Sequence, residues 1–374
     1  MKILFDLSAT QPNGANKRHG GGIYGEIILK RMAARGIRLL CYYDSKRWLN
    51  PEMMELCESN DYPLFDINEK NLKEIVRDEK IDRLYTCLAT NILTELPCTI
   101  YGTLHGLRHL ETPLDPIFRM YKNPFKRPFR MFLYRLFPNL YYKRVYEVTK
   151  KSIFKENQKL VVVSNHTRYS LISFFPEMAQ KEIPVFYSPD TSSKLLIERD
   201  CKDKYFLLVS GNRWEKNNIR AMIAFDRLIS KGLISNMKMK VAGANGTEFR
   251  YKFSNRECFD FLGYVDDNEL ARLYANAYLF VYPSLNEGFG YPPLEAMNYS
   301  TPVISSCISS LAEVLAGGVL FFSPFSVDEI MNRMLMMMNT DIHEKYSKEG
   351  HEQFLKIQRK QKEDLDGLID YIIK

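Results

Sequence analysis

Two glutamates flank a glycine-rich turn late in the 374-residue chain. The run Pro283-Ser-Leu-Asn-Glu287-Gly-Phe-Gly290-Tyr-Pro-Pro-Leu-Glu295 begins where an apolar strand ends, and its double proline suits the first turn of a helix. Backbone N–H groups at such a turn attract anions, and carboxylates accept hydrogen bonds from sugar hydroxyls. For two arbitrary acids, a helix-start role for Glu295 and a solvated loop role for Glu287 would be the ordinary interpretation. The Gly-Phe-Gly turn favours a binding site instead.

Two cations stand at the start of another predicted helix, in the run Gly211-Asn-Arg213-Trp-Glu-Lys216-Asn217. Cations are mildly unfavourable at that end of a helix. A bound anion therefore explains Arg213 and Lys216 better than ordinary surface charge does. Fixed cations of this kind stabilise the charge that develops on a departing diphosphate.

Three further features give weaker signals. The run His19-Gly20-Gly21-Gly22 is predicted to form a tight turn that lets the backbone approach a phosphate. His105 ends a predicted strand, where a lone histidine is more often structural than functional. Asp364 and Asp366 have metal-binding spacing but lie in a charged terminal helix. We interpret them as a solvated face and expect no metal site.

The elements that must position these residues alternate between apolar strands and amphipathic helices. Such alternation predicts βαβ units with parallel sheets, here in two doubly wound α/β domains. Ligands of such domains bind at the carboxyl ends of the strands. Strands are predicted at residues 2–6, 37–43, 83–87, 99–105, 160–164, 184–187, 205–210, 237–242, 259–263, 278–283, 302–306 and 319–322. Helices are predicted at residues 23–35, 217–231 and 267–276, from residue 292, and over residues 342–374.

Composition excludes several classes of protein. Apolar residues make up 45% of the chain and charged residues 26%, which is typical of globular domains and not of disordered chains. The 7 cysteines form no C-x-x-C pair, so we expect neither a disulfide framework nor a zinc site. No secretory signal and no apolar stretch of about 20 residues is present. These features predict a cytoplasmic protein, which is soluble or bound to a membrane surface.

The excess of positive over negative charge is concentrated between Ile117 and Lys155. This segment holds eleven Lys or Arg and eleven aromatic residues against one acid, Glu147. Cations interleaved with aromatic rings suit the interface of an anionic membrane, which we favour. Aromatic packing on the first domain is the alternative. We expect no nucleic-acid partner, because no nucleic-acid module accompanies the charge.

Across about residues 206–324 the sequence resembles the retaining glycosyltransferases of the GT-B fold, in their large fourth sequence family. Ser300 and Ala312 stand where that family commonly has glycine and proline. The resemblance rests on Gly263-Tyr-Val265-Asp266, Pro283-Ser284, Glu287-Gly-Phe289-Gly290, Pro293-Leu294-Glu295-Ala-Met297, Thr301-Pro-Val-Ile304, Ser309-Ser310 and Glu313-Val314.

The resemblance implies two Rossmann-like domains that face a central cleft. Residues 1–190 would bind the acceptor and residues 191–355 the nucleotide sugar, with a helix at 356–374 packing back on the first domain. Glu287 would contact the donor sugar and Glu295 the ribose, while Arg213 and Lys216 would hold the diphosphate. His105 would lie near the transferring oxygen. The remaining donor-binding positions would be Gly21, Gly22, Gly211, Val265, Phe289, Gly290 and Leu294.

These features together predict a retaining, mannosyltransferase-like glycosyltransferase of polysaccharide biosynthesis. It would move a sugar from a GDP- or UDP-linked donor to a saccharide or lipid-linked oligosaccharide, without a metal cofactor. Segment 117–155 would hold it on the inner face of an anionic membrane. The alternatives are a nucleotide-sugar epimerase or hydrolase of the same fold and a non-catalytic membrane-surface binding module.

Overall fold

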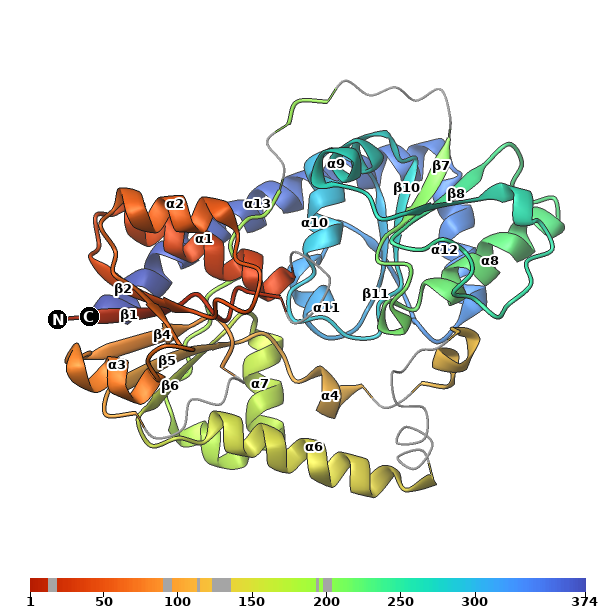
Figure 1. Cartoon of the computed structure of the whole chain (residues 1–374). Coiled ribbons are helices and arrows are strands. Elements are labelled where there is room, and N and C mark those ends of the chain that lie inside the picture. Colours follow the sequence, from red (N-terminus) through yellow and green to blue (C-terminus); the bar gives the residue numbers. More distant parts are fainter. Residues whose placement is uncertain (13–18, 90–95, 113–114, 123–135, 193–194, 198–203) are drawn as a thin grey trace. The chain divides into compact units, whose positions relative to one another are not determined.

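The chain forms two compact units, each built on one six-stranded sheet (Figure 1). The first unit comprises Met1–Leu107, Tyr142–Asp190 and Lys360–Lys374, and the second comprises Arg108–Tyr141 and Thr191–Arg359. Residues 108–141 thus cluster with the second unit, whereas the sequence analysis assigned them to the first domain. The computed structural model describes residues 1–12, 19–89, 96–112, 115–122, 136–192, 195–197 and 204–374.

The sheet of the first unit has the strand order β3-β2-β1-β4-β5-β6, and its neighbouring strands are parallel. The direction of winding reverses between β1 and β4, which makes this pair the topological switch point. The predicted strand at 184–187 is only an isolated bridge from Val185 to Val162. The strands are β1 (Ile3–Asp6), β2 (Leu39–Tyr43), β3 (Leu64–Asp66), β4 (Arg83–Thr86), β5 (Thr99–Leu104) and β6 (Gln158–Val162).

Helix α1 (Gly20–Ala34) begins three residues before the predicted start, so the glycine run forms its first turn and not a separate loop. His19 adopts an extended backbone and its Nδ1 accepts from the N–H of Gly22 at 3.1 Å, which caps the helix. A Cβ on Gly22 would lie 2.5 Å from the carbonyl oxygen of Thr10. The glycine is therefore needed because the helix start packs closely on the loop after β1.

The other helices of the first unit follow the βαβ pattern, and Figure 1 shows α1 and α2 on the same face of the sheet. The predicted terminal helix is the single helix α13 (Thr340–Ile373), whose residues from Lys360 onward belong to the first unit. The further elements are α2 (Pro51–Ser59), α3 (Leu72–Asp78), α6 (Pro138–Ile153), α7 (Asn165–Phe174) and the short helix η2 (Pro176–Gln180). Of α6, the residues from Tyr142 onward belong to this unit.

The two aspartates with metal-binding spacing have structural partners within the first unit. Both carboxylate oxygens of Asp366 accept from the guanidinium of Arg31, at 2.7 and 2.8 Å. Asp364 accepts from the backbone N–H of Tyr187 at 2.8 Å. Our interpretation of this helix face as merely solvated was therefore wrong, because its acids attach α13 to α1 and to the backbone at Tyr187.

The sheet of the second unit has the order β12-β11-β10-β7-β8-β9, again with parallel neighbours. This order repeats the winding of the first sheet, so the switch point lies between β7 and β10. The two sheets confirm the predicted pair of doubly wound α/β domains. The strands are β7 (Tyr205–Leu208), β8 (Lys238–Ala242), β9 (Phe259–Gly263), β10 (Leu279–Tyr282), β11 (Val303–Ser306) and β12 (Leu320–Phe322).

The second unit also takes in a segment that precedes β6 in the sequence. Ile117 and Tyr121 are buried in the core that β7, β8 and α8 form. The N–H of Arg250 donates to the carbonyl of Met120 at 2.7 Å. The helices of this unit are α4 (Arg108–Glu111), η1 (Pro116–Met120), η3 (Trp214–Lys216), α8 (Asn218–Ser230), η4 (Arg256–Cys258), α9 (Asp267–Asn276), α10 (Tyr291–Asn298), α11 (Ser310–Val314) and α12 (Val327–Met337).

Candidate active site

Lys216 and Glu287 meet at the switch point of the second sheet. Lys216 lies in η3, after β7, and Glu287 lies in the loop after β10. The Lys216 Nζ atom is 2.5 Å from Glu287 Oε1, and only 8% of Lys216 is exposed. The sequence analysis selected both residues, and the fold brings them together at the carboxyl edge where doubly wound sheets bind ligands.

Glu287 receives three hydrogen bonds on a single carboxylate oxygen. Tyr282 Oη donates to Oε1 at 2.6 Å and Ser284 Oγ at 2.5 Å, in addition to Lys216 Nζ. Burial alone would raise the pKa of Glu287, but the charge of Lys216 and these hydrogen bonds outweigh it and lower the pKa. Glu287 is therefore held ionised in one orientation, as a positioned negative charge.

The backbone around Glu287 is fixed on both sides. Its N–H donates to Ser309 Oγ at 2.9 Å, and its carbonyl accepts from Ser310 Oγ at 2.9 Å. Gly290 has a φ of 102°, and a Cβ there would lie 2.5 Å from Leu311 Cδ2. The turn that the sequence predicted therefore depends on glycine at this position.

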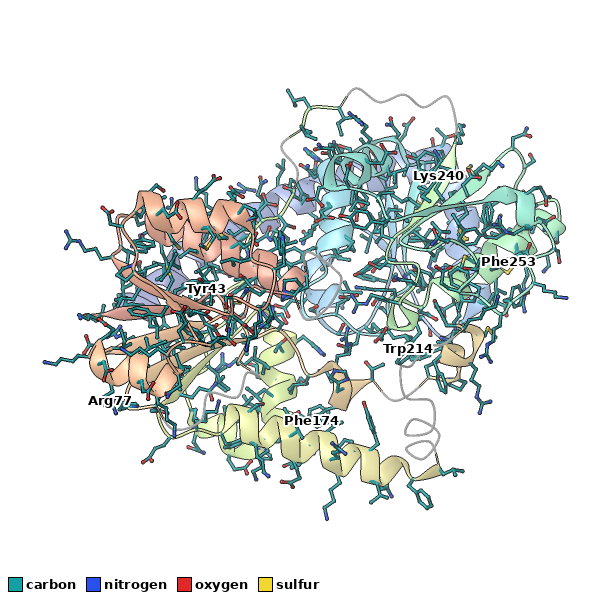
Figure 2. All side chains as sticks on the ribbon, viewed as in Figure 1. Tyr43, Arg77, Phe174, Trp214, Lys240 and Phe253 are labelled. Atoms are coloured by element: carbon teal, nitrogen blue, oxygen red, sulfur yellow. The ribbon has the colours of Figure 1, made fainter. Side chains whose placement is uncertain are left out.

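Lys216 is surrounded by groups of both signs. Its Nζ also donates to Tyr282 Oη at 2.9 Å. Burial is the main cause of its lowered pKa; Glu287 opposes this shift, while the positive charges of Arg213 and Arg108 add to it. Arg213 itself is exposed and caps η3. The next residue, Trp214, is labelled in Figure 2 and packs against Phe118, with 6.4 Å between ring centroids.

The remaining predicted donor-binding positions of the second unit differ in how far they are buried. Gly211 is buried, and a Cβ there would lie 2.7 Å from both Ala244 Cβ and Val241 Cγ1. Val265 is half-buried just after β9. The side chains of Phe289 and Leu294 are core residues, which leaves their backbone groups for a ligand.

Glu295 is the fifth residue of α10, one residue beyond the first turn in which the sequence analysis placed it. The reason is that the helix begins at Tyr291, before the two prolines. Its Oε1 accepts from Thr191 Oγ1 at 3.1 Å, and its charge acts together with burial to raise the pKa of Tyr274. The ribose-holding role of Glu295 stays a prediction.

His105, from the first unit, is held as a neutral ring. Its Nε2 lies 2.8 Å from the carbonyl oxygen of Cys87, and Tyr24 packs edge-on at 4.7 Å between ring centroids. Burial lowers its pKa to about 4. Gly21 and Gly22 lie in the first turn of α1 in the same unit. Contacts of His105, Gly21 and Gly22 with a donor stay predictions.

Acid is expected to destabilise the protein through His105. Because its folded-state pKa of about 4 is below the unfolded value of 6.5, the stability that this histidine gives is present above about pH 6.5. That stability is lost as the pH falls towards 4, by at most about 3 kcal/mol. Urea unfolding at neutral and acidic pH should give a smaller acid loss for His105→Gln than for the wild type. An equal loss of stability in acid for the variant and the wild type would contradict this role of His105.

The sequence analysis did not predict the roles of Tyr282 and Ser309 in this site, or that of His19 in the first unit. Tyr282 links Lys216 to Glu287, Ser309 fixes the Glu287 backbone, and His19 caps α1. Ser309 was part of a quoted motif, and its φ of 48° marks a strained position. Tyr282 gave no signal, because it ends an apolar strand. Within the described ranges, no three His, Cys, Asp or Glu residues gather where they could hold a metal ion.

Lys216 and Glu287 lie in a region of the chain that matches a known family. Residues 197–353 match the family described as "Glycosyl transferases group 1". The matched residues belong to the second unit. The chain is 30% identical over 238 residues to the O-antigen chain mannosyltransferase RfbU of Salmonella typhimurium, covering 62% of this chain and 61% of that protein. It is 33% identical to O-antigen chain mannosyltransferase B of Escherichia coli over 36% of this chain and 37% of that one.

Solved structures share the fold over nearly the whole length of the chain. Sucrose-phosphate synthase from Thermosynechococcus elongatus matches with a TM-score of 0.69 at 14% identity, covering 99% of this chain and 98% of that one. WaaG, a glycosyltransferase involved in lipopolysaccharide biosynthesis, matches with a TM-score of 0.67 at 16% identity and 99% coverage of both chains. HepE from Anabaena, solved with UDP-glucose, has a TM-score of 0.60 at 14% identity, with 98% and 100% covered. The chain has the GT-B fold.

Proposed function

We propose that the protein is a retaining glycosyltransferase that transfers mannose from a nucleotide-diphosphate donor to a growing surface polysaccharide. The observation that carries this proposal is the buried Lys216–Glu287 pair at the switch point of the second sheet. A buried lysine beside one carboxylate, with Arg213 nearby, suits a ligand that has both a diphosphate and a hydroxyl-rich ring.

The chemistry follows from the charges of the site. The bond from the anomeric carbon to the β-phosphate breaks, and the positive charges of Lys216 and Arg213 stabilise the growing charge on the diphosphate without a metal. The acceptor hydroxyl attacks from the same side and passes its proton to the departing phosphate oxygen. Glu287, whose Oε1 is held by three donors, positions the sugar and stabilises positive charge on its ring. It is not a covalent nucleophile in this scheme.

The mannose assignment rests on the relatives. RfbU and mannosyltransferase B are both named as O-antigen chain mannosyltransferases, while HepE was solved with UDP-glucose. For the donor base we propose guanine or uracil, with GDP-mannose as the first donor to test. The acceptor is proposed to be a lipid-linked oligosaccharide.

One assay tests the reaction and its rivals together. Purified protein is incubated with GDP-mannose or UDP-glucose, with and without lipid-linked oligosaccharide acceptors, in the presence of EDTA. We expect product only with an acceptor, with the anomeric configuration retained by NMR. Conversion of the donor sugar without an acceptor would identify an epimerase or hydrolase, and no turnover with any donor would indicate a binding module.

We further propose that the protein docks on an anionic membrane through α6. Part of the predicted 117–155 segment, residues 123–135, lies outside the described residues. On α6, Leu140 is 61% exposed and Val148 60% exposed. Exposed Lys143, Arg144 and Lys151 share that helix. Apolar side chains among exposed cations suit a helix lying at the lipid headgroups. Within the described part of the chain, no helix is long and apolar enough to cross a bilayer.

Reversal of three charges on α6 should release the protein from membranes. Lys143→Glu, Arg144→Glu and Lys151→Glu together remove roughly 1 kcal/mol of attraction for each cation. Sedimentation with phosphatidylserine-containing vesicles measures the effect. The control carries the same charge change at the exposed residues Lys231, Lys348 and Lys356, and should still bind. Equal sedimentation of the two variants would rule out docking through α6.

A further inference from the structure

Helix α4 packs directly on the loop that carries Glu287, although it precedes that loop by more than 170 positions in the sequence. Asn286 Nδ2 donates to Glu111 Oε2 at 2.6 Å. At the end of α4, Thr112 Oγ1 lies 3.5 Å from the carbonyl oxygen of Leu285. These contacts lie within the second unit, to which α4 belongs. These contacts hold the C-terminal end of α4, one helical turn from Arg108, against the loop that carries Glu287.

Arg108 has an unsatisfied donor there. Its Nε is buried and has no hydrogen-bond partner. Within the described part of the chain, no carboxylate forms an ion pair with its guanidinium. A buried N–H without an acceptor is unfavourable, so such a group in a native structure points to a missing partner.

The charges around Lys216 point to the same missing partner. Burial first, and then the positive charges of Arg213 and Arg108, lower the pKa of Lys216, whereas Glu287 alone opposes them. Arg213 and Arg108 therefore lie close enough to Lys216 for their charges to act on it. Like charges brought together in a partly buried place repel, and a doubly charged anion would turn that repulsion into attraction.

We propose that Arg108 is a third cation of the donor site, which binds the diphosphate of the nucleotide sugar together with Arg213 and Lys216. The unsatisfied Nε would donate to a phosphate oxygen, and the Glu111–Asn286 hydrogen bond would position α4 for it. The inference rests on the proposed function, because it assumes a nucleoside diphosphate at this site. It adds to that function a residue from outside the matched region 197–353.

Calorimetric titration of Arg108→Gln with GDP and UDP, with GMP and UMP, and with guanosine and uridine tests the inference. We expect a roughly tenfold loss of affinity for GDP or UDP, whichever the wild type binds more tightly. The reason is that hydrogen bonds from charged groups are stronger than those from neutral groups. The loss should be smaller for the monophosphate and absent for the nucleoside. Arg108→Lys should retain part of the affinity, because it keeps the charge. The control, Arg119→Gln, changes an exposed arginine of η1 in the same segment and should bind as the wild type does.

The outcomes separate the two proposals. If the wild type binds GDP or UDP and Arg108→Gln binds it equally well, the role of Arg108 is overturned while the proposed function stands. If the wild type binds neither diphosphate, both fail. An equal loss for nucleoside and diphosphate would show a general disturbance of the site, and would also overturn the inference. Thermal unfolding of each variant checks that the fold is intact.

Discussion

The Glu287→Gln variant is expected to lose sugar transfer by about 10²- to 10³-fold, the usual effect of removing one preorganised electrostatic group. Glutamine keeps the size of the side chain and can still accept on Oε1, where Tyr282, Ser284 and Lys216 donate. It removes the negative charge that the site holds ionised. Steady-state kinetics with GDP-mannose, or with the donor that the assay identifies, measures the loss in kcat.

Nucleotide affinity is the control for this variant. Because the diphosphate binds to cations and not to Glu287, Glu287→Gln should keep or strengthen the binding of the nucleoside diphosphate. A kcat within a few-fold of the wild type would remove Glu287 from the mechanism. A loss confined to nucleotide affinity would make it a binding residue only.

The Lys216→Met variant is expected to destabilise the protein by about 3–5 kcal/mol, because it leaves Glu287 as an uncompensated buried charge. Methionine fills a similar volume without the ammonium group, so the change isolates the charge. Tyr282 would also lose its donor from Lys216. The midpoint of urea unfolding at neutral pH measures the change in free energy.

A double variant separates charge from packing. Lys216→Met with Glu287→Gln removes both members of the pair, so it should recover a large part of the stability that Lys216→Met loses. If the two changes simply add, the pair is not coupled and the destabilisation arises from packing. Single Glu287→Gln completes the cycle.

Most strands and helices of the second unit could be predicted because local signals agreed. The structure has strand 259–263 and helix 267–276 at the predicted bounds. The helix could be predicted because Asp266 caps it and accepts a hydrogen bond from the N–H of Glu269 at 2.8 Å. The start of helix α1 was harder to predict, since its first three residues are glycines, which ordinarily mark a loop. Its start depends on the cap from His19 and on the approach of Thr10, which are tertiary features.

The site itself was only partly accessible from sequence. Lys216 and Glu287 are 71 positions apart, and no spacing rule joins residues at that distance. The family resemblance suggested their partnership, and the switch-point topology explains it physically. The roles of Tyr282 and Arg108 were hidden, because Tyr282 ends an apolar strand and α4 reaches the loop of Glu287 only through folding.

Each unit is assembled from pieces of chain that lie far apart, which affects how the protein is made. The acids of α13 that bind Arg31 and Arg35 are more than 330 positions away from them. A ribosome must therefore synthesise the residues from Lys360 onward before the first sheet gains its last helical cover. Until then its apolar face stays open to chaperones or aggregation. A genetic cut at residue 190 would divide both units and yield two incomplete fragments, so complementation by co-expressed halves would require both to be present together.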